Sequence, residues 1–274
     1  MRDMIPKTIH YFWFGNNPLP SLAQKCIDSW KKYCPDYEIK RWDETNFDVN
    51  MCEYVKEAYA AKKWAYVSDY ARFYILNKYG GVYLDTDVEL LKPIDNILKQ
   101  GPFFALETDE YDSLNPGIGM ATYVNNVFYK KILNDYNNSH YLTKEGIEIN
   151  LPVGKRVATF LKRDGLKNVK GIQRIDGINI YPKEYFCPLN YFTGELQLTK
   201  NTVAIHHYAA SWLSEKEKRN HKIGQKVSRY FGISFGEKIE RILDFPHSLN
   251  SKINSVGIKK TTTYYFKKYI KKKY

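Results

Sequence analysis

Two aspartates, Asp85 and Asp87, follow a short apolar run over residues 82–84 that has the character of a buried strand. Strand geometry puts alternate side chains on one side, so both carboxylates are expected to face the same way, with Thr86 opposite. Carboxylates held side by side repel unless a cation lies between them, and all-oxygen ligands suit Mn²⁺ or Mg²⁺. An isolated Asp-x-Asp can also be a solvated strand end. The preceding segment has to decide between the two interpretations.

That preceding segment, residues 65–79, is predicted to form a helix that two glycines terminate. Asp69 and Arg72 lie three residues apart and therefore share one face of this helix. Alone, they could be a surface ion pair that contributes roughly 0.2–0.5 kcal/mol. The glycine turn, however, returns the chain toward the same end of the helix, where the two aspartates follow.

Combined, these elements resemble the signature of the sugar-binding DxD glycosyltransferases, specifically glycosyltransferase family 32. The matching motifs are Ser68-Asp69-x-x-Arg72, Tyr79-Gly80-Gly81-x-Tyr83, Asp85-x-Asp87 and the opening Ile5-Pro6-Lys7-Thr8-Ile9-His10-Tyr11-Phe12-Trp13. The resemblance implies an α/β fold of GT-A type: a Rossmann-like mixed, mostly parallel sheet flanked by helices. It also implies transfer of a hexose from a nucleotide diphosphate sugar, with retention of the anomeric configuration.

The resemblance further implies roles for individual residues. Asp69 and Arg72 would hold the hydroxyls of the donor sugar, and Arg72 could also approach its phosphates. Asp87 would hold Mn²⁺ or Mg²⁺ with help from Asp85 and His206, which makes Asp69, Arg72, Asp85 and Asp87 the catalytic candidates. The remaining donor-binding candidates are Tyr11, Trp13, Ser68, Thr86, Ser211 and Trp212. His206 is favoured over His207 because strand alternation lets only one of them face the site.

The rest of the chain alternates strands and helices, which predicts a largely parallel sheet. Strands are expected at residues 7–14, 37–42, 82–84, 88–91, 103–107, 178–186 and 202–207, and helices at 21–33, 53–60, 126–136 and 155–163. Ligands of such sheets sit beyond the carboxyl ends of the strands, so Tyr11, Trp13 and Gly15 could border a base or ribose. Trp13 fits a core position equally well, and His10 is interpreted as a packed, hydrogen-bonded histidine.

Acceptor-side residues are harder to assign. Glu107 ends an expected strand and could lie near the donor sugar, although strand-end glutamates are more often solvated. The glycine-rich loop at residues 115–121 resembles the segment that lines the sugar and acceptor site in relatives, but it lacks the Gly-Lys-Ser/Thr of a phosphate-binding loop. Relatives commonly carry Thr-Gly-Pro where this chain has Leu151-Pro152-Val153-Gly154, so no acceptor residue is carried over.

Charge divides the chain of 274 residues into two parts, residues 1–214 and 215–274. The net charge is +12, and residues 215–274 hold sixteen Lys or Arg against five Asp or Glu, which leaves the first part nearly neutral. The first part is predicted to be the GT-A transferase domain and the second a basic, partly helical extension. Between residues 265 and 272 apolar and lysine side chains separate onto opposite helical sides, which suits either an anionic membrane surface or a solvated terminus. A nucleic-acid partner is not expected, because the folded part is not basic.

Cysteine spacing and hydropathy bear on the compartment. The four cysteines show neither Cys-x-x-Cys nor a zinc pattern, the N-terminus lacks the apolar core of a signal peptide, and no segment of about 18 apolar residues occurs. A reduced, cytoplasmic protein is therefore expected, peripheral at the inner face of the cell membrane if the tail binds lipid.

The leading hypothesis is a metal-dependent, retaining hexosyltransferase. A UDP-hexose is the favoured donor by resemblance, and the favoured acceptor is a growing surface glycan, such as a bacterial capsular polysaccharide, or a lipid-linked oligosaccharide. Two alternatives remain: a non-catalytic glycan-binding relative, and an aspartate-nucleophile phosphatase in which Asp85 would be phosphorylated. Against the phosphatase, its motif usually opens a domain, and no later Asp-Asp pair supplies a metal site.

Overall fold

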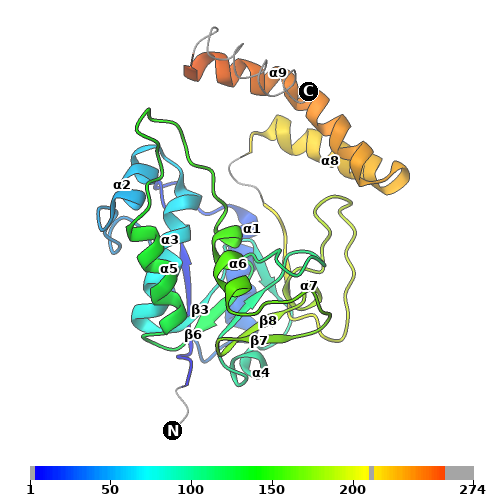
Figure 1. Ribbon diagram of the computed structural model, residues 1–274. Coiled ribbons are helices and arrows are strands. Elements are labelled where there is room, and N and C mark those ends of the chain that lie inside the picture. Colours follow the sequence, from blue (N-terminus) through cyan, green and yellow to red (C-terminus); the bar gives the residue numbers. More distant parts are fainter. Residues whose placement is uncertain (1–3, 210–212, 257–274) are drawn as a thin grey trace. The chain divides into compact units, whose positions relative to one another are not determined.

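The computed structural model describes residues 4–209 and 213–256, with side chains as far as residue 245. Within these residues seven strands form one sheet in the order β2-β1-β3-β6-β5-β8-β7. Figure 1 labels β3, β6, β7 and β8 of this sheet. The seven strands are β1 (Thr8–Phe12), β2 (Glu38–Trp42), β3 (Gly81–Tyr83), β5 (Phe103–Ala105), β6 (Met120–Thr122), β7 (Gln173–Ile175) and β8 (Ile178–Tyr181). Only β6 and β7 run against the others, so the predicted mixed, mostly parallel sheet is confirmed.

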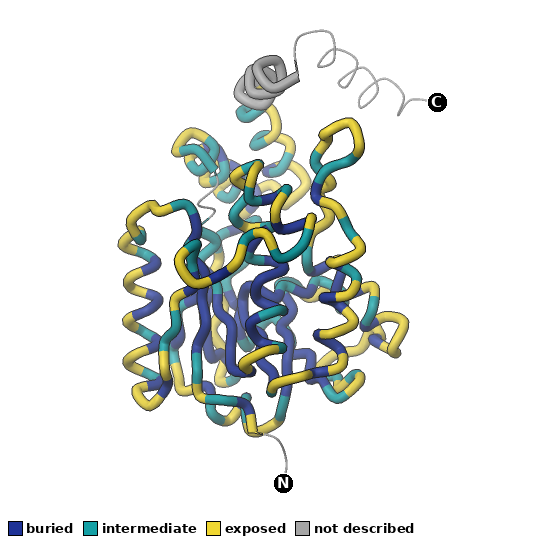
Figure 2. Tube along the Cα trace, turned by 90° about the vertical axis from the view of Figure 1, so that its left-hand side faces the viewer, coloured by how far each residue is buried: buried dark blue, intermediate teal, exposed yellow. Residues whose placement is uncertain are grey.

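Helices cover both faces of this sheet, and the strands between them are buried (Figure 2). One face carries α2 (Glu53–Ala60), α3 (Trp64–Tyr79), α5 (Val127–Asn137) and α6 (Val153–Arg163), and the other carries α1 (Ser21–Tyr33), α4 (Asp95–Leu98) and α7 (Lys183–Phe186). Alternation along β1 feeds both cores, because Ile9 and Tyr11 pack on the α1 side while Phe12 packs on the α3 side. This explains why the strands read as continuous apolar runs.

The glycine stop after α3 is confirmed. Gly80 has φ 68° and Gly81 has φ 101°, conformations that favour glycine. A Cβ on Gly80 would lie 2.7 Å from Pro6 Cδ, and one on Gly81 would lie 2.6 Å from the carbonyl oxygen of Thr8. The two glycines therefore let β3 turn directly back from α3 and pair closely with β1.

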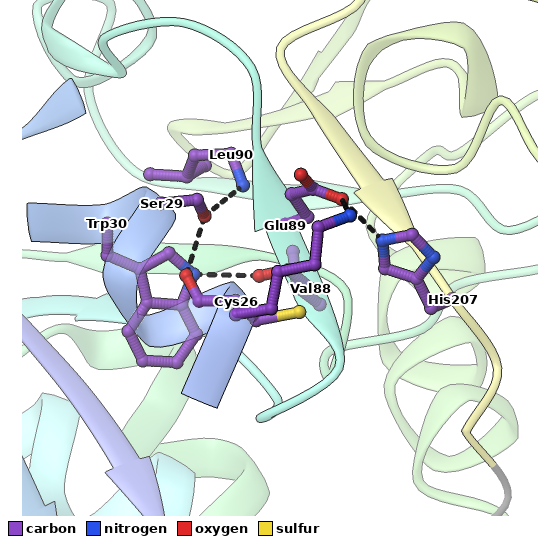
Figure 3. Close-up of polar contacts among 8 residues, drawn as sticks. Cys26, Ser29, Trp30, Val88, Glu89, Leu90 and His207 are labelled. Carbon is purple, nitrogen blue, oxygen red and sulfur yellow. Dashed lines mark hydrogen bonds and ion pairs between the residues drawn. The ribbon is translucent and has the colours of Figure 1, made fainter. Parts of the chain in front are cut away.

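A separate two-stranded sheet pairs β4 (Val88–Leu90) with β9 (Ala204–His206) in antiparallel register. Side chains of helix α1 form hydrogen bonds with β4 on the side opposite β9 (Figure 3). The Trp30 indole N–H donates to the Val88 carbonyl at 2.7 Å, and the Leu90 N–H donates to Ser29 Oγ at 2.9 Å. The strand that follows Asp85 and Asp87 is thus held on both sides.

One predicted strand is wrong over its second half. The expected strand at residues 178–186 ends at Tyr181, and α7 begins at Lys183. Pro182 lies between them with an extended backbone and cannot donate to a ladder, so it ends the strand and starts the helix.

The chain divides into two compact units, Met1–Leu189 with Gln197–Ala209, and Asn190–Leu196 with Ala210–Tyr274. The helices of the second unit are α8 (Glu215–Phe231) and α9 (Ile233–Val256). Ser214 and Glu217 form a capping box at the start of α8, where each side chain binds the backbone N–H of the other. All four cysteines are free thiols. In the part of the chain that the structure describes, no helix has the length and hydrophobicity of a membrane span.

Candidate active site

Asp85 and Asp87 lie in a turn between β3 and β4, so the expectation of two aspartates on one side of a strand is wrong. The Val88 N–H donates to the Asp85 carbonyl at 3.0 Å and closes the turn. The reason is topological: β3 belongs to the large sheet, whereas β4 leaves it to pair with β9. As a result, the two carboxylates meet different neighbours.

Asp85 joins a buried cluster around Arg72. Its Oδ1 accepts a hydrogen bond from the Tyr83 hydroxyl at 2.5 Å and lies 3.6 Å from Arg72 Nη2. The same Nη2 lies 3.0 Å from Asp69 Oδ1, and the guanidinium sits over the Tyr83 ring at 4.7 Å. Only 5% of the Arg72 side chain is exposed. One buried cation therefore bridges a carboxylate of α3 and a carboxylate of the turn.

Burial and mutual attraction set the protonation of this cluster. Burial raises the pKa of Asp69 to about 6, against the opposing effect of Arg72. Burial disfavours the charged form of Arg72, but Tyr83, Asp85 and Asp69 outweigh it and raise the pKa of Arg72 above its ordinary value. Arg72 is thus a permanent positive charge, while Asp69 can take up a proton in mildly acidic solution.

The raised pKa of Asp69 predicts a pH-dependent stability difference. Because the folded-state pKa of about 6 exceeds the ordinary value of 3.8, the contribution of Asp69 to the free energy of unfolding is present below about pH 4 and is lost as the pH rises through 6. We expect Asp69→Asn to gain on the order of 3 kcal/mol relative to wild type between pH 4 and pH 8. Urea denaturation across this range measures the difference. The exposed Asp48→Asn is the control, and a pH-independent difference for Asp69→Asn would contradict the assignment.

The glycine-rich loop at residues 115–121 positions Asp85. The Asp85 N–H donates to the Gly117 carbonyl at 2.8 Å, and the Gly117 N–H donates to Asn115 Oδ1 at 2.9 Å. A Cβ on Gly117 would lie 1.9 Å from Asp85 Oδ2. The loop therefore needs glycine at this position, because any side chain would push the Asp85 carboxylate away from its partners.

Gly117→Ala tests this steric role. We expect about a tenfold or greater loss of nucleotide-sugar turnover, because the added methyl group displaces the Asp85 carboxylate. The measurement is a double-mutant cycle with Asp85→Ala. In the Asp85→Ala background the same methyl group should have little further effect. Equal losses in both backgrounds would show that Gly117 acts without Asp85.

Asp87 faces His206 on β9. Asp87 Oδ2 lies 3.4 Å from His206 Nε2 and accepts a hydrogen bond from the Ala209 N–H at 2.8 Å. Burial opposes ionisation of both side chains, but their attraction outweighs it: the pKa of Asp87 is lowered and the pKa of His206 is raised well above its ordinary value. His207 instead pairs with Glu89 at 2.7 Å (Figure 3). Glu89 also binds Lys25. The two neighbouring histidines thus serve different carboxylates.

The predicted three-ligand set of Asp85, Asp87 and His206 is not assembled, because Arg72 and Tyr83 hold Asp85. Among the described residues no group of three or more His, Cys, Asp or Glu side chains is arranged to hold a metal ion. Asp87 offers one oxygen, and His206 offers one nitrogen once it gives up the proton that Asp87 stabilises. This donor pair suits Mn²⁺, with further positions for water or phosphate, as is usual for such cations.

The other predicted donor-binding residues make contacts within the protein or lie in the turn. Tyr11 is buried with its ring edge on Trp30, at a centroid distance of 5.7 Å. The half-buried Trp13 donates its indole N–H to the Asn17 carbonyl at 2.6 Å, and Ser68 donates its hydroxyl to the Trp64 carbonyl at 3.0 Å. Thr86 lies in the turn between the two aspartates. Ser211 and Trp212 lie outside the described residues.

His10 is the packed histidine that the sequence predicts. Its Nδ1 accepts a hydrogen bond from the Trp42 indole at 3.1 Å, and its Nε2 contacts the Gly80 carbonyl at 3.0 Å. Burial lowers the pKa of His10 to about 4. His10 is therefore neutral at pH 7 and connects β1, β2 and the glycine stop of α3.

Three residues with a part in this arrangement were not assigned from the sequence. Tyr83 could have been found, because it stands two residues before Asp85 and so points the same way along an extended chain. Gly117 lies in the glycine-rich loop that the sequence singled out, but its contact with Asp85 was not predicted, and Arg156 gave no signal. Arg156 is buried, sits 4.0 Å from the centroid of the Tyr136 ring, and its charge lowers the pKa of Asp69.

The stretch at residues 20–104, which contains α3 and the DxD turn, matches the family described as "Glycosyltransferase sugar-binding region containing DXD motif". This match supports the glycosyltransferase class over the part of the chain that it covers. The chain is also similar to inositol phosphoceramide mannosyltransferase 1 of Schizosaccharomyces pombe, at 28% identity over 154 residues, which is 52% of this chain and 46% of that protein.

Two more relatives come from a fungus and a virus. Inositol phosphoceramide mannosyltransferase 3 of S. pombe is 38% identical over 106 residues (34% of this chain, 27% of that protein), and uncharacterized glycosyltransferase L373 of Acanthamoeba polyphaga mimivirus is 34% identical over 107 residues (37% and 43%). The chain thus spans less than half the length of these relatives. Among solved structures, the PaToxG glycosyltransferase gives a TM-score of 0.44 at 20% identity, covering 60% of this chain and 71% of that one.

Proposed function

We propose that this chain is a metal-dependent glycosyltransferase that moves a hexose from a nucleotide diphosphate sugar to a glycan or lipid-linked acceptor, with residues 1–214 carrying the reaction. The observation that supports it is that the two aspartates of one turn contact different groups. Asp85 joins the buried pair of Asp69 and Arg72, while Asp87 faces His206. One side of the turn suits sugar hydroxyls, and the other suits a cation with phosphates.

On the sugar side, Asp69 and Arg72 supply complementary groups. The carboxylate accepts hydrogen bonds from hydroxyls, and the guanidinium donates them in a fixed planar fork. Their mutual contact at 3.0 Å fixes both groups before a donor arrives. We assign Asp85 and Thr86 to the same hexose and to the ribose of the nucleotide. Tyr11 and Trp13 are assigned to the base, and Ser68 supports the helix through its hydrogen bond to the Trp64 carbonyl.

On the phosphate side, Asp87 and His206 would hold the metal ion. A bound Mn²⁺ or Mg²⁺ supplies positive charge that neutralises the diphosphate leaving group. Arg72 adds a fixed positive charge, since its pKa is raised by its carboxylate and tyrosine neighbours. Ser211 and Trp212 are proposed to contact the leaving group. The imidazole ligand favours Mn²⁺ over Mg²⁺.

We propose retention of the anomeric configuration. Asp69 and Asp85 are both engaged by Arg72, which disfavours either one as a covalent nucleophile. The acceptor would then attack from the face that the diphosphate leaves, with the departing diphosphate as base. Isolation of an inverted product would exclude this course.

For the donor and the acceptor we propose a chemical class rather than a particular compound. A UDP-hexose remains the favoured donor, and the names of the relatives add a mannosyl donor such as GDP-mannose. Those names also support a lipid-linked acceptor over a soluble one. Such an acceptor would be reached at the cytoplasmic side of a membrane, with the basic extension resting on anionic lipid, and a bacterial surface polysaccharide is one such glycan.

A screen of nucleotide sugars for metal-dependent hydrolysis and transfer tests the proposal. UDP-hexoses and GDP-mannose are each incubated with Mn²⁺, Mg²⁺ or chelator. Cleavage of one donor only in the presence of metal is the expected result. If no donor is cleaved and nucleotide binding does not depend on metal, the donor site is excluded, and Asp85 and Asp87 return to the phosphatase or a structural role.

A further inference from the structure

The helices α8 and α9 pack through small side chains. Gly224, Ser228 and Gly236 are buried at their contact. A Cβ on Gly236 would lie 1.9 Å from Ser228 Oγ, and one on Gly224 would lie 2.8 Å from Glu240 Oε2. The two backbones therefore approach too closely for large side chains between them.

Polar pairs complete the same contact. His221 Nδ1 lies 3.0 Å from Glu240 Oε1, and the Asn220 side-chain amide donates to Asp244 Oδ1 at 2.7 Å. The helices are thus joined by glycine, serine and hydrogen-bonded polar residues. The large apolar side chains of this helical hairpin are left for another surface.

Four of those apolar side chains gather where the two helices meet. Around Gly232, whose φ of 87° ends α8, the exposed fractions are 83% for Tyr230, 71% for Phe231, 41% for Ile233 and 48% for Phe235. We call these four residues the hairpin tip. Single exposed apolar residues are ordinary, but a group of this kind marks an interaction surface.

Positive charge accompanies the tip. Lys222 and Lys226 on α8 and Lys238 on α9 are exposed. In the sequence, the 29 residues from 246 to 274 add eight lysines and no acidic residue. Aromatic side chains beside lysines match the boundary of an anionic bilayer, where rings enter the headgroup layer and ammonium groups meet lipid phosphates.

We propose that the hairpin tip inserts into the surface of an anionic lipid bilayer and anchors the second unit there. The arrangement fits a bilayer because exposed lysines neighbour the exposed apolar residues in sequence, Lys226 four residues before Tyr230 and Lys238 three residues after Phe235. The inference shares with the proposed function only the membrane surface, and it does not depend on the donor or on the metal.

Vesicle co-sedimentation of the full chain tests the inference. The probes are vesicles of phosphatidylcholine alone and vesicles that also contain phosphatidylglycerol. We expect wild type to bind the anionic vesicles. The double variant Phe231→Ser/Phe235→Ser should show a roughly tenfold or greater fall in the partition coefficient. Lys222→Gln and Lys226→Gln should each lower it about fivefold. Val169→Ser and Leu198→Ser, which replace exposed apolar residues elsewhere, should bind as wild type does.

A second measurement keeps the test valid if the serine variants unfold. Tyr230→Trp preserves an aromatic tip, and its fluorescence should shift to shorter wavelength when anionic vesicles are added. Unchanged vesicle binding by the serine variants, or no fluorescence shift, would overturn the tip as the anchor. A concentration-dependent dimer of wild type that these variants abolish would show instead that a second copy covers the tip. Hydrolysis of the nucleotide sugar without vesicles should be unaffected, so failure here and failure of the proposed function are distinguishable.

Discussion

Replacing Asp87 by asparagine is expected to lower metal-dependent turnover of the nucleotide sugar by about 10²–10³-fold or more. The amide can still accept the hydrogen bond from the Ala209 N–H, so the turn should keep its shape. What it loses is the negative charge that faces His206 and would hold the cation. Binding of Mn²⁺, followed by its paramagnetic resonance, should weaken in parallel.

Strand β4, which follows Asp87 directly, offers a matched control. Glu89 pairs with His207 at 2.7 Å (Figure 3), as Asp87 faces His206. The Glu89 carboxylate, however, also binds Lys25 of α1. Glu89→Gln should therefore retain near wild-type turnover and Mn²⁺ binding. If both variants lose activity equally, the histidine–carboxylate pairs serve the contact of β4 with β9 rather than a cation.

Replacing Arg72 by methionine is expected to destabilise the fold by about 3–5 kcal/mol, because it leaves two carboxylates beside each other without their buried cation. Arg72 is 5% exposed and contacts both Asp69 and Asp85. Urea denaturation at pH 7 measures the loss. Adding Asp69→Asn should restore part of the stability, since it removes one of the unpaired charges.

A surface pair provides the comparison. Arg41 Nε lies 3.0 Å from Asp43 Oδ2, but 41% of the Arg41 side chain is exposed. Arg41→Met should therefore change the free energy of unfolding by less than about 1 kcal/mol. A double variant of Arg72 and Asp69 that is no more stable than Arg72→Met alone would mean that packing, not charge, sets the effect.

Local features of the fold were predictable from the sequence. The helix at residues 65–79 and its glycine stop depend on residues a few positions apart, and the structure has a helix over Trp64–Tyr79. The geometry of Asp85 and Asp87 could not be predicted from the sequence, because it depends on β4 leaving the large sheet to pair with β9. Strand alternation predicts side-chain direction only while the chain stays extended.

The same division applies to the candidate site. Asp69 and Arg72 share a helix face by spacing alone, so their pairing could be predicted. The steric requirement at Gly117 could not, because it arises from a loop that folds against Asp85 from a distant part of the chain. The hairpin tip was also beyond the sequence, since only the close approach at Gly224 and Gly236 reveals which apolar side chains are left exposed.

The pairing of β4 with β9 affects the order in which the protein can be assembled during synthesis. Ala209, which donates to Asp87, is 122 residues further along the chain, and β9 is the strand that pairs with β4. A nascent chain that has emerged only to residue 104 contains the whole stretch matched by the sugar-binding family, yet one edge of β4 is still unpaired and Asp87 has no histidine. The Asp87–His206 side of the turn can thus form only after residue 209 has emerged from the ribosome.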